Sequence, residues 1–195
     1  MDYTNPQTTI TPASYANLND ALNYICSYLN AGYTWHKRIA NQCRKIHIRG
    51  WGRWHDCEAD GDSDHLICLE KLLMDKLKYA PTIDMKRAEM ASTAKLDNLN
   101  DFKDHHRTWK KHEQEGIAAL NYAVNASRSV DIEVYYKMCA LLDEAQKEVM
   151  RLEMAYDRLE FGGWMGHDIG VCSMIVHKYF ELEHKDGHDI NFNLG

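Results

Sequence analysis

The sequence has 195 residues and a mass of 22.7 kDa, which is enough for one domain with a hydrophobic core. Hydrophobic residues make up 45% of it, charged residues 27%, and the formal net charge is -6, which excludes a disordered chain. No stretch approaches the ~20 consecutive apolar residues of a membrane span, and no secretion signal is visible at the start. We therefore expect a protein of the cytoplasm or of a virus particle, with no membrane partner.

The chain contains only three prolines, Pro6, Pro12 and Pro81. Such long stretches without a helix breaker exclude a turn-rich β sandwich or barrel and predict long helices. Residues 1–12 are polar and predict an extended N-terminal arm. A first helix is expected to begin near Pro12, with a break or kink at residues 30–32, and to resume to about residue 48. The glycines in 49–52 predict a turn.

Further along the chain, periodic apolar positions predict a second helix over about 53–79 and a third over about 83–126. The middle of the third helix, near 97–104, is polar and is a candidate site for a break. A fourth helix is expected to begin between Ser129 and Asp131 and to stop at Gly162. A short fifth helix over 168–184 and a polar tail over 185–195 complete the prediction. The fold class is all-α: one domain spanning 1–195, with a bundle of four or five helices over 13–184. The six cysteines contain no CxxC pair and are expected to be reduced thiols.

Charge is distributed in two blocks. Six basic residues and no acid lie between residues 37 and 53, and five acids follow within residues 56–64. This pattern is compatible with a solvated helix face carrying local salt bridges, with nucleic-acid binding, or with head-to-tail contact between copies. The negative net charge disfavours nucleic acid. We expect a homo-oligomer, such as a ring, whose interface contains Lys37, Arg38, Arg44, Arg49, Trp51 and Trp54 on one side and Asp60, Asp62 and Asp64 on the other.

Two segments of the second half have the residue types of a carboxylate-bridged metal site, which needs acids and Glu-x-x-His pairs projecting into a bundle. Glu113-Gln-Glu-Gly-Ile-Ala-Ala-Leu resembles the third helix of bacterioferritin and its ferritin relatives, and Leu142-Asp-Glu-Ala-Gln-Lys147 resembles the fourth. The resemblance implies iron as the cofactor and Asp62, His65, Glu113 and Glu144 as its ligands. The sequence departs from that family in two respects. Lys147 stands where the family has a histidine, and no glutamate precedes Glu58 to serve as the first-helix ligand.

Other short blocks resemble the tail-adaptor protein (tail tubular protein A) of short-tailed phages, in the same order along the chain. They are Ala21-Leu-Asn-Tyr-Ile25, Arg44-Lys-Ile-His-Ile-Arg-Gly-Trp51 and Ala126-Ser-Arg128, followed by Asp143-Glu-Ala145 and Gly162-Gly163. That family has a β-rich insertion where residues 65–125 here predict helix. The resemblance implies a head–tail adaptor whose terminal arms dock on other structural proteins.

Two hypotheses follow from the sequence. The first is a non-enzymatic structural protein, a homo-oligomer without a cofactor, of which a phage head–tail adaptor is the most concrete form. The alternative is a ferritin-like protein that binds or oxidises iron.

Overall fold

The computed structural model describes residues 15–45, 49–86 and 99–161, and these ranges contain four long helices and no strand. The helices are α1 (Leu18–Lys45), α2 (Arg49–Leu77), α4 (Leu99–Ser127) and α5 (Ile132–Phe161). The expected all-α bundle is thereby confirmed. The N-terminal arm, the expected fifth helix and the polar tail lie outside the described residues. None of the helices in the described ranges is both long and apolar enough to cross a membrane.

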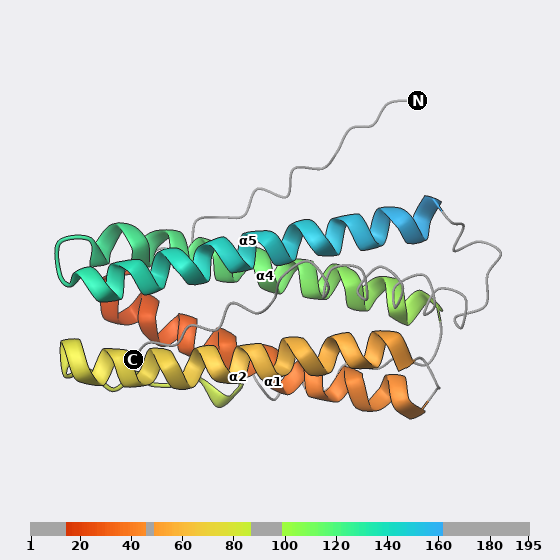
Figure 1. Cartoon of the computed structure of the whole chain (residues 1–195), viewed down its shortest axis with the longest axis horizontal. Coiled ribbons are helices and arrows are strands. Elements are labelled where there is room, and N and C mark those ends of the chain that lie inside the picture. The colour runs from red at the N-terminus through yellow and green to blue at the C-terminus, as the bar shows by residue number, and fades with distance from the viewer. Residues whose placement is uncertain (1–14, 46–48, 87–98, 162–195) are drawn as a thin grey trace.

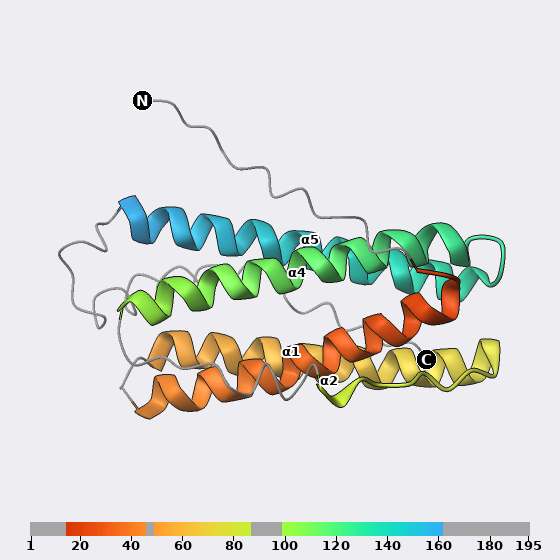
Figure 2. The same cartoon turned by 180° about the vertical axis from the view of Figure 1, so that it is seen from behind.

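The four helices form two layers, α1 with α2 and α4 with α5 (Figures 1 and 2). Each layer is an antiparallel pair, and α1 also packs on α4 while α2 packs on α5. α4 begins at the same end of the bundle as α2, so α2 and α4 run parallel (Figure 1). One long crossover between two antiparallel pairs is the connectivity of ferritin-like bundles, as opposed to bundles joined only by short loops.

The helix starts follow local capping chemistry. The Asn17 side chain accepts a hydrogen bond from the backbone N–H of Asp20 at the start of α1. Asp131 accepts from the N–H groups of Glu133 (2.9 Å) and Val134 (3.0 Å) at the start of α5, close to the predicted position. At the end of α2, Lys78 has φ 52°, in the left-handed region that commonly terminates helices.

Three sequence predictions about these elements are corrected. α1 passes through residues 30–32 without a break. α2 begins at Arg49 and includes the glycines that were predicted to form a turn. There Gly52 packs against α1, since a Cβ on it would lie 3.1 Å from the Cβ of Cys43. Residues 78–84 are not helical; instead they run along α1, where Asn23 accepts hydrogen bonds from the Tyr79 hydroxyl (2.6 Å) and the Thr82 N–H (2.7 Å).

The interior of the bundle changes character along its length. One end is aliphatic and contains Leu22, Ile25, Leu69, Leu73, Leu120, Val134 and Met138. The opposite end buries four tryptophans with several histidines: Trp35, Trp51, Trp54 and Trp109 with His36, His55, His105 and His106. Between these two ends lies a layer of acidic side chains. Five described cysteines are free, in agreement with the expected reduced thiols.

Candidate metal centre

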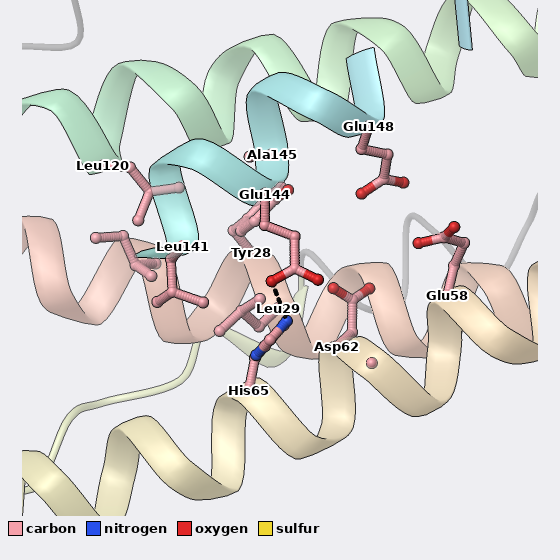
Figure 3. A pocket seen from close by; sticks show the side chains of 12 residues that line it. Tyr28, Leu29, Glu58, Asp62, His65, Leu120, Leu141, Glu144, Ala145 and Glu148 are labelled. Carbon is pink, nitrogen blue, oxygen red and sulfur yellow. Dashed lines mark ion pairs between the residues drawn. The ribbon is translucent and has the colours of Figure 1, made fainter. Parts of the chain in front are cut away.

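Five acidic side chains from three helices converge in the middle of the bundle: Glu58 and Asp62 on α2, Glu113 on α4, and Glu144 and Glu148 on α5. The two acids on α2 are four residues apart, as are the two on α5, so each pair lies on one helix face. Figure 3 shows both pairs pointing into a single pocket between α2 and α5. The cavity has a volume of about 40 Å³.

Aromatic side chains hold three of these carboxylates by donating hydrogen bonds to them. The Tyr28 hydroxyl on α1 donates to Glu113 Oε2 on α4. The indole N–H of Trp54 donates to Glu58 Oε1 (2.6 Å), and that of Trp109 donates to Glu148 Oε1 (3.0 Å). These donors are neutral, so they orient the carboxylates without neutralising their charge.

The first helix contributes an imidazole to this acidic layer. His36 is 1% exposed, and one of its ring nitrogens forms a group with a carboxylate oxygen each of Glu113 and Glu148, all within 4.8 Å of one another. His36 Nε2 is 4.0 Å from Asp62 Oδ2, whereas Nδ1 lies against His55. The ring therefore turns Nε2 toward the carboxylates.

The second histidine of the site lies nearer the solvent. His65 Nε2 on α2 is 2.8 Å from Glu144 Oε2 on α5, as the dashed line in Figure 3 indicates. The Glu144 side chain is 48% exposed, whereas that of Asp62 is 18% exposed. The cavity therefore has an outer rim at His65 and Glu144 and a deeper part at Asp62 and Glu148.

Burial and mutual repulsion raise the pKa values of the buried acids in this layer. Burial above all, together with repulsion from the nearby carboxylate of Glu58, raises the pKa of Glu113 to about 8, although the hydrogen bond from Tyr28 opposes this rise. The pKa values of Asp62 and Glu148 lie well above their usual range, first because of burial and then because of repulsion from neighbouring carboxylates, Glu113 above all. The pKa of His36 is lowered because burial disfavours its charged form. Ionised carboxylates at this spacing repel one another, and the neutral imidazole does not offset their charge. The cluster therefore favours the binding of a cation.

The dimensions of the layer fit a metal ion. Nitrogen and oxygen ligands lie about 2.0–2.2 Å from a bound transition metal, so two ligands on opposite sides of one ion are roughly 4.2 Å apart. The three atoms from His36, Glu113 and Glu148, within 4.8 Å of one another, need only a small inward shift to share an ion. The adjoining cavity of about 40 Å³ exceeds the ~10–15 Å³ that one water molecule needs. Carboxylate oxygen with imidazole nitrogen is a donor set suited to Fe, Mn or Zn.

The four residues that the sequence singled out as ligands all lie in this region. Asp62, His65 and Glu144 line the cavity, and Glu113 is 2% exposed and close enough to Asp62 to raise its pKa. Their role as ligands stays a prediction.

Sequence reasoning missed three members of the layer: His36, Glu58 and Glu148. Glu58 and Glu148 were accessible to it, because each is four residues from an acid that was selected and therefore shares its helix face. Lys147, the departure from the ferritin pattern, points away from the layer and pairs with Asp143 at 2.6 Å, half exposed. The missing first-helix acid has a counterpart in His36, which no spacing rule predicted.

The residues expected at an oligomer interface do not all lie on the surface of the bundle. Trp51 and Trp54 are buried within the chain, at 0% and 4% exposed, and Asp62 lines the cavity. The basic and acidic blocks also pair within the chain. Lys37 contacts Asp60 (2.6 Å), and Arg44 contacts Asp56, both between α1 and α2.

The other three residues of the expected interface are Arg38, Asp64 and Arg49. The side chains of Arg38 and Asp64 are exposed. Arg49 is the first residue of α2, and its side chain lies outside the described part. The interface stays a prediction for the surface residues.

Comparison with known proteins places this geometry within a class of folds. A four-helix bundle with one long crossover is the arrangement of ferritin-like folds. Among solved structures, the chain is similar to the crystal structure of M. penetrans ferritin, with a TM-score of 0.64 and 11% sequence identity over 86% of this chain and 98% of that one. At this identity the similarity shows the fold. No protein-family model matches the sequence, and the search of curated proteins found no match.

Proposed function

We propose that this chain binds a divalent transition metal in the acidic layer of its bundle, with Fe(II) as the first candidate ion and Mn(II) as the second. One observation carries the proposal: ligand atoms of Glu113 on α4 and Glu148 on α5 lie within 4.8 Å of one another and of the His36 imidazole on α1, and Asp62 on α2 lies 4.0 Å from that ring. The ferritin of similar fold supports iron as the first ion to test. Bound iron supplies one-electron transfer to dioxygen, which makes iron oxidation the activity to look for.

The chain's own residues have separable roles in this proposal. His36, Glu113 and Glu148 would hold the ion at the deep position, where Asp62 also lies, and His65 with Glu144 would supply ligands at the rim. Tyr28, Trp54 and Trp109 each fix one carboxylate by a hydrogen bond, which preserves the geometry when the ion is absent.

The test compares wild-type protein with Glu113→Gln and Glu148→Gln. Each protein is stripped with EDTA, titrated anaerobically with Fe(II), and then exposed to air while ferric absorbance is followed. We expect wild type to bind iron and both variants to lose at least ~10-fold in affinity. Glu153→Gln is the matched control, since this glutamate on α5 is half exposed and pairs with Lys110 at 2.6 Å. Equal binding by all four proteins, or none by wild type, contradicts the proposal.

The structural, non-enzymatic hypothesis takes second place. The separated charge blocks that favoured it pair within the chain, at Lys37 with Asp60 and at Arg44 with Asp56. A homo-oligomer remains compatible with a metal centre inside each bundle, and its existence stays a prediction that a native mass measurement decides.

A further inference from the structure

Three buried histidines from three helices form a continuous line that starts at the candidate metal centre. His36 Nδ1 on α1 is 2.8 Å from His55 Nδ1 on α2. His55 Nε2 is in turn 3.1 Å from His105 Nε2 on α4. All three rings are buried, at 1%, 0% and 4% exposed. The proposed function assigns a role to His36 and none to His55 or His105.

Tryptophans enclose this line of rings. Trp35 stacks on His105 with ring centroids 4.4 Å apart and an interplanar angle of 23°, and Trp109 lies 4.8 Å from His55. Indole faces offer no hydrogen-bond acceptor of ordinary strength, so the ring nitrogens in the line satisfy one another.

The three imidazoles are neutral in this environment. All three rings are buried against tryptophans or against one another, and burial disfavours the charged form of an imidazole. For His105, burial lowers the pKa to about 3. A neutral imidazole carries one N–H and one lone pair, on opposite nitrogens. In each of the two contacts, therefore, one ring donates and the other accepts.

These rules leave only two arrangements for the whole line. If His36 donates from Nδ1, His55 must accept at Nδ1, carry its proton on Nε2 and donate it to His105. If the line runs in the opposite sense, His105 donates to His55, His55 donates to His36, and His36 carries its proton on Nε2. Only the first arrangement leaves the Nε2 lone pair of His36 available to a metal ion.

We propose that His55 and His105 are positioning residues: through the two ring contacts they set the tautomer of His36 and so decide whether its Nε2 lone pair faces the metal centre. The proposal rests on the proposed metal-binding function. Changing from the second arrangement to the first moves one proton from His55 to His36 and one from His105 to His55. His105 Nδ1 takes up one proton from solvent, and His36 Nε2 releases one to a carboxylate of the centre. The net charge of the three rings does not change.

A spectroscopic test reads the tautomers directly. The ¹⁵N chemical shifts of histidine are measured in metal-free protein and in protein loaded with Zn(II), a diamagnetic substitute. In the Zn(II) form we expect protons on His36 Nδ1, His55 Nε2 and His105 Nδ1. In the metal-free form we expect the three tautomers of either the first or the second arrangement. A mixed set of tautomers in either form, or a charged ring in the line at pH 7, overturns the proposal.

Substitutions at His55 separate its two contacts. An asparagine amide reaches the position of Nδ1, whereas a glutamine amide reaches that of Nε2. We expect His55→Asn to keep Zn(II) affinity within a few-fold, and His55→Gln and His55→Phe to lose about 10–100-fold, the usual effect of removing the partner of a ligating histidine. Equal affinities for His55→Asn and His55→Gln overturn the proposal, and this pair decides it even if His55→Phe fails to fold.

His106→Phe is the matched control for the loss of a buried histidine. His106 is 3% exposed and near Trp51, and its Nε2 bonds the Leu152 carbonyl at 2.9 Å outside the line, so we expect unchanged affinity. The two proposals fail in distinguishable ways. If wild type binds no metal, the proposed function is wrong, whereas the tautomers of the metal-free protein still report whether the three rings act as one unit.

Discussion

Gly32 on α1 lies directly against the carboxylate of Asp62 on α2: a Cβ on Gly32 would stand 2.2 Å from Asp62 Oδ2. No side-chain atom fits in that space, so the aspartate reaches its place in the acidic layer over the bare backbone of α1. This close approach explains why α1 contains a glycine at a position where the sequence predicted a break.

Gly32→Ala is expected to displace the Asp62 carboxylate and to lower Fe(II) or Mn(II) affinity by about 10-fold or more. The stabilisation of about 1 kcal/mol that alanine normally brings to a helix interior should be offset by the clash. Gly61→Ala is the matched control, because a Cβ there meets no atom within 4 Å. We expect it to raise the thermal denaturation midpoint and to leave metal affinity unchanged. Calorimetric titration and thermal scans of both variants measure these effects, and equal metal affinities would exclude a role for Asp62.

Adjacent positions on α5 are expected to respond in opposite ways. Glu148→Gln removes a ligand from the deep position and should lower metal affinity at least ~10-fold. Lys147→Gln removes only an exposed i,i+4 pair with Asp143, so it should cost at most about 0.5 kcal/mol and leave metal binding intact. Metal content after equilibrium dialysis checks both. Loss of binding in the Lys147 variant would show that the register of α5 differs from the one described.

Stability of the metal-free protein should depend on pH in two opposite ways. Between about 4.5 and 8 the folded state keeps a proton on Glu113 that the unfolded state has released, so the free energy of unfolding falls as pH rises through this range. Between about 3 and 6.5 the unfolded state binds a proton at His105 that the folded state excludes, so stability falls as pH decreases. The denaturation midpoint should therefore be highest between about pH 4.5 and 6.5.

The alkaline decline has its own control variant. Glu113→Gln cannot ionise at this position, so it should flatten the fall in the denaturation midpoint between pH 6.5 and 8, whereas the exposed Glu153→Gln should leave the fall unchanged. Thermal scans of EDTA-treated protein from pH 4.5 to 9 make the comparison. A decline of the same size in Glu113→Gln would mean that this carboxyl is already ionised in the folded protein.

Charge reversal tests the predicted homo-oligomer. Replacing Arg44 and Arg49 by glutamate should break assembly between copies while the helices persist, as measured by light scattering and circular dichroism. Within one chain, loss of the contact between Arg44 and Asp56 should cost no more than about 1 kcal/mol, because the arginine is more than half exposed. An unchanged native mass would exclude these residues from an interface.

Much of the secondary structure was predictable from local chemistry. Asp131 sets the start of α5 through hydrogen bonds to the next turn, and the apolar period of the fourth helix carries it as far as predicted. Two of the three errors occurred at glycines. Gly32 and Gly52 looked like breakers, but both are helical positions where another helix approaches too closely for a side chain, which a single sequence cannot distinguish from a turn.

The sequence by itself determined a helical bundle and the positions of the acids along each helix, because helix periodicity and capping act over a few residues. Only the tertiary structure decided which acids meet. It turned Glu148 rather than Lys147 inward, brought His36 from α1 to Glu113 of α4, and placed His55 between two other histidines. It also paired the basic block of α1 with the acidic block of α2 within the chain. These relationships depend on the relative rotation and register of whole helices, which packing across the bundle sets and no local pattern encodes.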